Sequence, residues 1–337
     1  MSIDKLPTIT QIAIIGFGWV ARDYMLPAIA AHADATLCAV VSVRPADFEG
    51  LDRSVACYTD AAAMLASERP DAVYVASPNH LHAAHVLLCA RAGVDVLCEK
   101  PLAATYADAE RLVHAALDAG IAFATAYDQR HHPAHHLMRE VIAAGQLGTI
   151  TQARIDYACW LPADWSADNW RIDQAKAGGG AIIDLAPHGL DLLEHLLDST
   201  ITDLHCYEQR AVQDYPVDDG GILTARFAND ALAALSVAYN RPETLPRRRL
   251  EITGTQGMLL AENTMGQTPG GTLTFINAAT GRREALAFDT TTGPFYHQLD
   301  AFLQYRKTRD GRNPKEDLRL AKLLDQAIAP ALNSYPT

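Results

Sequence analysis

Residues 11–21 read QIAIIGFGWVA and decide the fold of the N-terminal half. The run Gln11–Ile15 is short and mostly apolar, which is typical of a buried parallel strand. The pattern Gly16-x-Gly18-x-x-Ala21 follows it and leads into a helix expected over 25–33. Here the first glycine permits a tight turn, the second lets the backbone approach a pyrophosphate, and the small Ala21 allows close packing of helix on sheet. We expect a dinucleotide to contact Gly16, Phe17, Gly18, Trp19 and Val20; an ordinary turn between strand and helix is the alternative.

The alternation of strand and helix continues to about residue 128. Further buried strands are expected at 36–43, 72–76, 95–98 and 121–126, with helices at 60–67, 82–92 and 106–119. Strands separated by helices in this way form βαβ units around a parallel sheet. The sequence therefore predicts an α/β fold that opens with a doubly wound, Rossmann-type domain over residues 1–128.

The pattern changes after Asp128. Helices are expected at 134–144, 186–197, 294–307 and 315–329, and a strand at 150–157. Strand candidates with alternating polarity follow at 223–227, 232–239, 249–253, 258–261 and 273–275. This pattern predicts a second α/β domain over 129–337, whose mostly antiparallel sheet leaves one face open.

The composition excludes several classes of protein. The 337 residues, 49% of them hydrophobic, suit a globular chain of two domains and not a disordered one. The net charge of −12 argues against a nucleic-acid partner, because phosphate backbones are bound by concentrated Lys and Arg. We expect no signal peptide and no membrane span, and the six scattered cysteines fit reduced thiols in the cytoplasm.

The end of the second strand bears on the choice of nucleotide. A carboxylate at this place usually holds the adenosine ribose of NAD. In this chain Ser42 takes the place, and Arg44 follows two residues later. A serine hydroxyl and an arginine can bind a 2′-phosphate, which a carboxylate would repel. We therefore expect NADP to be preferred over NAD; in the alternatives, Asp47 turns toward the ribose or Arg44 is simply solvated.

Two further motifs follow predicted strands of the parallel sheet. Ser77-Pro78-Asn79 and His82 come after the third strand, and Glu99-Lys100-Pro101 comes after the fourth. Ligands of such sheets bind at the carboxyl ends of the strands. Lys100 is the candidate for proton transfer, and a surface lysine beside a turn is the alternative. The residues expected to contact the cofactor are Ser77, Pro78, Asn79, His82, Glu99 and Lys100.

Taken together, these motifs resemble those of a known family. The ordered set Gly16-x-Gly18-x-x-Ala21, Ser77-Pro-Asn79-x-x-His82, Glu99-Lys100-Pro101, Arg130-x-x-Pro133 and Gly178-Gly-Gly-Ala-x-x-Asp184-x-x-x-His188 is similar to the Gfo/Idh/MocA (glucose–fructose oxidoreductase / inositol dehydrogenase) family, from about Ile9 to Ala329. The resemblance implies a Rossmann domain and a second, open-sheet domain for substrate binding and oligomerisation. It also implies an NAD(P)-dependent dehydrogenase or reductase of sugars, cyclitols or similar polyols that forms a homodimer or homotetramer.

The resemblance places the catalytic groups at Lys100, Asp184 and His188. A spacing of four residues puts Asp184 and His188 on one face of a helix, and Pro187 fits the first turn of that helix, with Asp184 at or near its cap. A histidine can exchange a proton with a substrate hydroxyl at neutral pH. A structural histidine and a purely capping aspartate are the alternatives.

Candidate substrate contacts come from two stretches of the second domain. Asp128 stands where family members often have Asn, so its charge would favour polyhydroxylated or cationic substrates, and His131 begins a cluster of four histidines. A loop that carries Trp160, Trp165 and Trp170 among charged residues suits the faces and hydroxyls of sugars, unless it packs its rings on the core. We expect no metal, because no carboxylate completes a zinc pattern. The expected substrate contacts are Asp128, His131, Trp160, Trp170 and Arg171.

The function expected from the sequence is hydride transfer between a nicotinamide and a carbon that bears a secondary hydroxyl or a ketone. Two alternatives stay open: an NAD-dependent glycosidase of the same family that works by transient oxidation, and a non-catalytic dinucleotide-sensing protein. The intact set of Lys100, Asp184 and His188 counts against the sensing protein, since a binding module needs no such set.

Overall fold

The structure is a computed structural model that describes residues 9–161, 169–311 and 313–332. Contacts between residues divide the chain into two compact units. The first comprises the chain up to Ala126 together with Phe295–Leu318, and the second comprises Tyr127–Pro294 together with the chain from Arg319 onward. A single boundary after residue 128 therefore does not describe these contacts, because residues 295–318 return to the first unit.

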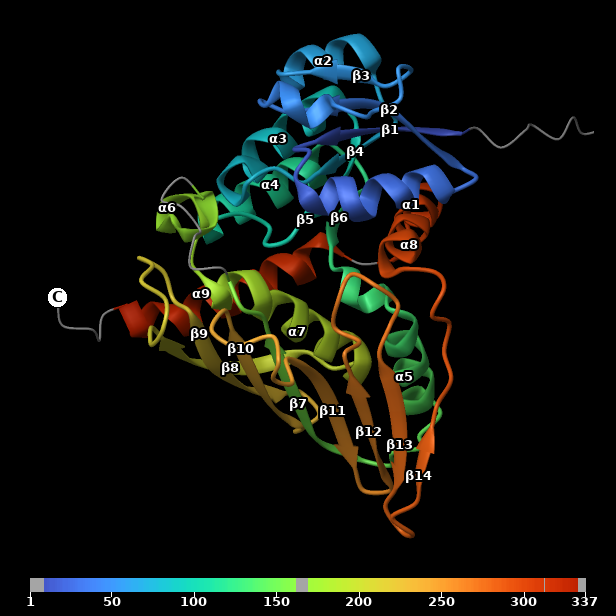
Figure 1. Cartoon of the computed structure of the whole chain (residues 1–337), viewed down its shortest axis with the longest axis vertical. Helices are drawn as coiled ribbons and strands as arrows, with labels where there is room; N and C mark the ends of the chain where they lie inside the picture. Colours follow the sequence, from blue (N-terminus) through green and yellow to red (C-terminus); the bar gives the residue numbers. More distant parts are fainter. Residues whose placement is uncertain (1–8, 162–168, 312, 333–337) are drawn as a thin grey trace, which may run out of the picture. The chain divides into compact units, whose positions relative to one another are not determined.

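The first unit contains a six-stranded sheet in the order β3-β2-β1-β4-β5-β6, and all neighbouring strands in it are parallel (Figure 1). The order changes direction between β1 and β4, which is the switch point of a doubly wound sheet, where ligands bind. The predicted Rossmann-type fold is confirmed. The strands are β1 (Thr10–Ile15), β2 (Ala35–Val41), β3 (Ala56–Tyr58), β4 (Ala72–Val75), β5 (Asp95–Glu99) and β6 (Phe123–Ala126).

Helices connect these strands. A π-helical turn, η1 (Ala21–Met25), leads into α1 (Leu26–Ala31), and a short 3₁₀ turn, η2 (Pro45–Phe48), follows β2. Asp60 caps the helix that begins at Ala61, and Thr105 caps the helix that begins at Tyr106. Each side chain accepts a backbone N–H group of the first turn. The remaining helices are α2 (Ala61–Glu68), α3 (Asn79–Ala92) and α4 (Tyr106–Asp118).

Helix α8 (Pro294–Thr308) belongs to the first unit although it lies far along the chain. Its apolar residues recur every three or four positions and therefore share one helix face. This face packs into the same buried cluster as η1, α1 and β1. Arg306 in the last turn adds a partly buried ion pair with Asp95 at 2.7 Å. The α8 side chains in the core are Phe295, Leu299, Phe302 and Leu303.

The second unit contains an eight-stranded sheet in the order β14-β13-β12-β11-β7-β10-β9-β8 (Figure 1). Only the pair β7 and β10 is parallel in this sheet, and the other neighbours are antiparallel. The predicted mostly antiparallel sheet is confirmed. The strands are β7 (Ile150–Ala158), β8 (Ile201–Gln209), β9 (Gly220–Phe227), β10 (Leu232–Ala238), β11 (Arg248–Gly254), β12 (Gly257–Glu262), β13 (Thr272–Asn277) and β14 (Arg283–Ala285).

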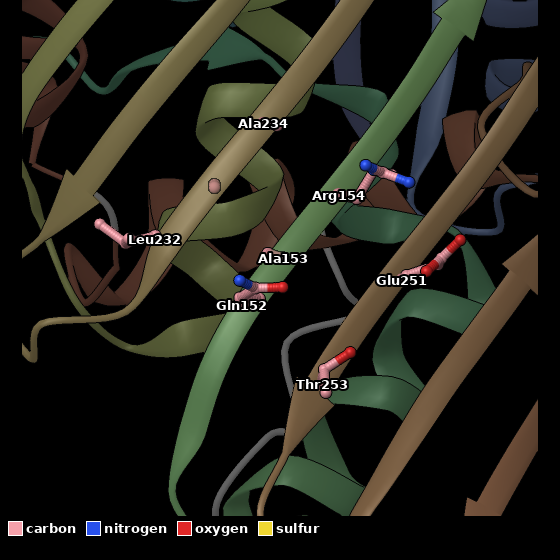
Figure 2. A pocket seen from close by; sticks show the side chains of 8 residues that line it. Gln152, Ala153, Arg154, Leu232, Ala234, Glu251 and Thr253 are labelled. Atoms are coloured by element: carbon pink, nitrogen blue, oxygen red, sulfur yellow. The ribbon is translucent and has the colours of Figure 1, made fainter.

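One face of this sheet is covered and the other is open. Helix α7 (Ala181–Leu197) contacts β7, β9 and β10, and α5 (Pro133–Ala143) packs beside α7. Figure 2 shows Gln152, Arg154, Glu251 and Thr253 on the opposite face of β7 and β11, with helices behind the strands. With Leu232 these side chains line a shallow pocket. The other helical segments of the unit are η3 (Asp128–His131), η4 (Trp170–Ile172), α6 (Gln174–Ala177) and most of α9 (Pro314–Leu332).

The sequence pattern missed three strands, β3, β8 and β14. Each of them lies at an edge of its sheet. An edge strand has a neighbour on one side only, so fewer of its residues are buried and its apolar pattern is weaker. All three residues of β14 are exposed, for example. Among the described residues no helix has the length and apolar character needed to cross a membrane.

Candidate active site

The glycine loop after β1 has the geometry of a cradle. Gly16 has φ +92°, and a Cβ at this position would lie 2.4 Å from the backbone nitrogen of Ser77, so the turn requires glycine. At Gly18 a Cβ would meet nothing within 4 Å, so this part of the backbone faces open space. The amide of Arg22 donates to the carbonyl of Gly18 at 3.0 Å, which starts the first helical turn directly after the loop. These features fit a bound pyrophosphate.

The side chains of the loop point in different directions. Phe17 is 2% exposed and packs in the core, so only its backbone is available to a ligand. Trp19 is 46% exposed, and its ring meets the edge of Tyr24 at a centroid distance of 5.9 Å. Val20 is half-buried against the core cluster. Contact of Phe17, Trp19 and Val20 with a cofactor stays a prediction.

Strand β2 ends without an acidic residue, but the turn that follows it places a carboxylate at the same edge of the sheet. Asp47 from η2 is buried and accepts a hydrogen bond from the Ser42 hydroxyl at 2.5 Å. Arg44 Nε donates to the same carboxylate oxygen at 3.1 Å, and an Arg22 terminal nitrogen donates to the other oxygen at 3.3 Å. Ser42 and Arg44 therefore share this edge of the sheet with an acid and with a second arginine.

The buried side chain of His82 holds the motif after β4 in place. His82 is 1% exposed, and its two ring nitrogens lie 2.7 Å from the carbonyl oxygen of Ser77 and 2.9 Å from that of Pro101. Burial lowers the pKa of His82 to about 4, although the carbonyl contacts act in the opposite direction. His82 thus ties the loops after β4 and β5 together. Pro78 is the N-cap of α3 and Asn79 is its first residue, so both lie at the same sheet edge.

The motif after β5 places Glu99 and Lys100 beside this tie. The Tyr74 hydroxyl donates to Glu99, whose carboxylate also accepts the backbone N–H of Lys100 at 3.3 Å. Lys100 is half-buried, and its peptide bond to Pro101 is cis. The glycine loop, Ser77 and Lys100 follow β1, β4 and β5, which are neighbours in the sheet. The predicted cofactor residues of the first unit therefore lie along one edge of it.

In the second unit, helix α7 begins earlier than predicted. The run Gly178–Gly180 precedes it, and a Cβ on Gly180 would lie 1.9 Å from the carbonyl oxygen of Asp218. The Asp218 carboxylate accepts the amides of Gly180 at 2.7 Å and Ile182 at 2.8 Å and so caps the helix. Burial raises the pKa of Asp218 to about 6. Pro187 lies inside the helix, so the prediction that it occupies the first turn is wrong.

Asp184 and His188 contact different partners. Asp184 lies in the first turn of α7 and accepts a hydrogen bond from the Tyr239 hydroxyl at 2.7 Å. Burial raises the pKa of Tyr239 well above its ordinary value, and the charge of Asp184 adds to this effect. This keeps Tyr239 protonated as a donor. Tyr239, the residue directly after β10, thus fixes the Asp184 carboxylate.

His188 faces an acid that the sequence assigned to substrate binding. Its Nδ1 lies 3.1 Å from Oδ1 of Asp128, an ion-pair distance when the imidazole is protonated. His188 is 4% exposed and Asp128 2% exposed. The ring of Tyr157 meets the imidazole edge to face at 5.7 Å, and Gln129 Nε2 donates to the other Asp128 oxygen at 3.0 Å. Direct contact of Asp128 with substrate stays a prediction.

The histidine cluster is mostly structural. His135 is buried, with Nδ1 2.7 Å from the carbonyl oxygen of Gln129 and Nε2 2.9 Å from the Thr264 hydroxyl. His132 caps α5 through its Nδ1, which accepts the amide of Ala134. Burial lowers the pKa of His131 and of His135 to about 3. In the described ranges no three His, Cys, Asp or Glu side chains are arranged to hold a metal ion.

The loop that carries the three tryptophans is described in part. Trp160 is 37% exposed and forms a bridge with Asn240, while Trp170 begins η4 and lies under the Arg171 guanidinium at 4.4 Å. Trp165 lies outside the described residues. Whether Trp160, Trp170 and Arg171 contact substrate stays a prediction.

Comparison with known proteins agrees with this arrangement. Residues 10–127 match an oxidoreductase family with an NAD-binding Rossmann fold, and residues 135–260 match the GFO/IDH/MocA C-terminal domain. The 1,5-anhydro-D-fructose reductase of Ensifer adhaerens is 33% identical over 271 residues, which are 79% of each protein. The chain belongs to the Gfo/Idh/MocA family. It is therefore an oxidoreductase of the class that contains dehydrogenases and reductases of sugars.

Other similar proteins extend the match over nearly the whole chain. The NADP⁺-dependent D-xylose 1-dehydrogenase 2 of Haloferax volcanii is 28% identical over 88% of this chain and 85% of its own length. The aldose-aldose oxidoreductase of Caulobacter crescentus has the same fold, with a TM-score of 0.83 at 23% identity, covering 96% of this chain and 98% of its own.

The sequence pattern did not indicate three residues of this candidate site, Arg22, Tyr239 and Asp218, and it offered the inward position of Asp47 only as an alternative. Arg22 follows the glycine motif directly, and that position is a usable signal because the first helical turn borders the nucleotide site. Tyr239 and Asp218 lie 55 and 38 residues from their partners Asp184 and Gly180, so only the folded sheet brings them together.

Proposed function

We propose that this chain is an NADP-preferring oxidoreductase that moves a hydride between the nicotinamide and a carbon bearing a secondary hydroxyl or a ketone, in a sugar, cyclitol or related polyol. The observation that carries the proposal is the placement of Lys100 at the end of β5, on the same sheet edge as the Gly16–Gly18 cradle. A proton-handling amine beside a dinucleotide cradle is what carbonyl reduction requires.

Each catalytic side chain has a role in this proposal. The bound nucleotide supplies or accepts the hydride. Lys100 donates a hydrogen bond to the substrate oxygen and polarises its carbon. His188 exchanges the hydroxyl proton through Nε2, because its Nδ1 faces Asp128. Asp184, held by Tyr239, orients the substrate hydroxyls.

The preference for NADP is supported by the charges at the end of β2. Two guanidinium groups, of Arg22 and Arg44, lie beside Ser42, with side chains 47% and 67% exposed. Exposed guanidinium groups retain donors for a phosphate. The D-xylose 1-dehydrogenase 2 is named for NADP⁺, and its match with this chain spans 85% of its own length.

The class of substrate is supported by the relatives and by polar groups of the second unit. The named relatives act on 1,5-anhydro-D-fructose and D-xylose, both of which are polyhydroxylated. Trp170 and Arg171 are half-buried. The Trp170 ring offers an aromatic face to such molecules, and the Arg171 guanidinium offers hydrogen-bond donors for their hydroxyl groups. We assign His131 and Trp160 to the same substrate-binding surface.

Assembly as a homodimer or homotetramer is part of the proposal. The open sheet face carries exposed apolar side chains, among them Tyr207, Ile222 and Leu232, at 75%, 54% and 43% exposure. A second copy would cover them. The cytoplasmic location expected from the cysteines stays a prediction.

The test is a cofactor-coupled absorbance screen of sugars and inositols with NAD and NADP in parallel. With an active substrate found, Lys100→Ala and His188→Ala should each lose most turnover and still bind nucleotide, while the exposed-site controls Lys307→Ala and His205→Ala keep full rate. The double variant should lose little more than either single variant if both groups serve one step. Full activity in both single variants, or release of free sugar from a glycoside without added nucleotide, would contradict the proposal.

A further inference from the structure

The environment of Asp47 is unusual for a site that binds a 2′-phosphate. Its carboxylate is buried at the end of β2, where the adenosine ribose lies in this fold. The Ser42 hydroxyl and Arg44 Nε both donate to Oδ2, and Arg22 donates to Oδ1. Every group that would bind the phosphate is therefore also bonded to an acid.

The charges of this cluster do not cancel. Two guanidinium groups face one carboxylate, which leaves a net charge of one positive unit near the ribose. Such a balance attracts a 2′-phosphate less strongly than two unopposed arginines would. The carboxylate, in turn, is an acceptor that a 2′-hydroxyl can use and a phosphate cannot.

We propose that Asp47 is the specificity-determining residue of the cofactor site: its carboxylate accepts the ribose 2′-hydroxyl of NAD and moderates the pull of Arg22 and Arg44 on the 2′-phosphate of NADP. The enzyme therefore uses both nucleotides, with a modest preference for NADP. This inference rests on the proposed function, since it concerns the nucleotide of that reaction. It differs from a simple serine-for-acid exchange at Ser42, because the acid is restored from the following turn.

A purely structural role for Asp47 makes a different prediction. A side chain that only anchors the turn after β2 would, when removed, weaken all adenine nucleotides by the same factor. A specificity-determining carboxylate changes the ratio between nucleotides with and without the 2′-phosphate. The ratio thus separates the two roles.

The experiment measures binding of 2′,5′-ADP and 5′-AMP by titration calorimetry, which needs neither substrate nor turnover. Asp47→Asn keeps the shape of the side chain and an acceptor for Ser42. We expect it to bind 2′,5′-ADP about tenfold tighter and 5′-AMP severalfold weaker, the scale of one charge-assisted contact. Arg44→Ala should weaken 2′,5′-ADP about tenfold and leave 5′-AMP unchanged. Asp47→Glu, which restores the charge, should return the ratio toward wild type.

The exposed Asp52 of the next turn provides the matched control, and Asp52→Asn should leave both affinities unchanged. An equal change for both nucleotides in Asp47→Asn would overturn the proposal and leave the proposed function intact. Failure of the wild-type chain to bind either nucleotide would instead overturn the proposed function itself. Thermal unfolding of each variant shows whether a loss of affinity reflects loss of fold.

Discussion

His188 Nδ1 lies 3.1 Å from Asp128 Oδ1, and both side chains are almost completely buried. In the proposed mechanism, this carboxylate orients the ring and leaves Nε2 for a substrate hydroxyl. Asp128→Asn should therefore lower kcat by roughly ten- to a hundredfold, a part of the roughly 10²–10⁴-fold that general acid–base catalysis contributes, while KM changes little. Steady-state kinetics over pH 6–9 provide the measurement.

The surface pair of His205 and Asp203, with a 3.2 Å contact, supplies the control for this prediction. Asp203→Asn should not change kcat, because this pair is exposed on β8. If Asp128→Asn instead raised KM and left kcat unchanged, the acid would contact substrate directly, as the sequence suggested.

Residues near in sequence were easier to predict than residues that meet across the sheet. The strand, glycine loop and helix at 10–31 follow from local apolar pattern and turn chemistry, and so does Lys100 at the end of β5. The position of Asp47 does not follow, since whether η2 folds its side chain back toward Ser42 depends on packing of the whole turn.

The start of α7 shows the same limit. Pro187 is compatible with a first turn, and this local rule predicted the helix start wrongly. The cap comes from Asp218, which reaches Gly180 only because β9 lies next to the helix in the folded unit. A rule based on neighbouring residues has no access to that contact.

The bond from the Tyr239 hydroxyl to Asp184 gives a second prediction. Tyr239→Phe removes the 2.7 Å bond and leaves a partly buried carboxylate with one donor fewer. The free energy of unfolding should fall by about 1–3 kcal/mol and turnover severalfold, since Asp184 loses its fixed orientation. Urea unfolding and kcat measure the two effects. Tyr305→Phe, on helix α8 of the first unit, should change neither, and a Tyr239→Phe variant with wild-type kcat would show that Asp184 needs no such support.

The open sheet face gives a third prediction. Ile222→Asp combined with Leu232→Asp places two charges on a surface that we propose is covered by a second copy of the chain. The assembly should dissociate to monomers at micromolar concentration, as measured by analytical ultracentrifugation. Leu245→Asp, a change at an equally exposed residue outside the strands, serves as the control. A wild-type chain that sediments as a monomer would refute the assembly, and an intact oligomer in the double variant would place the interface elsewhere.

The buried histidines predict loss of stability in acid. His135 is satisfied in its neutral form, with Nδ1–H donating to Gln129 and Nε2 accepting from Thr264, and burial lowers its pKa to about 3. The unfolded chain takes up this proton near pH 6.5, so below that pH the unfolded state binds more protons than the folded state does. The stabilisation that neutral His135 contributes is thus fully present above pH 6.5. It is lost as the pH falls toward 3, and the free energy of unfolding falls by up to about 1.4 kcal/mol per pH unit for each such group. Urea unfolding at pH 7.5, 6.0, 5.0 and 4.5 should show the decline, and His135→Gln should be less stable at pH 7.5 but have a shallower slope below pH 6. The exposed His205→Gln should keep the wild-type slope, and an unchanged slope in His135→Gln would assign the acid sensitivity to other groups.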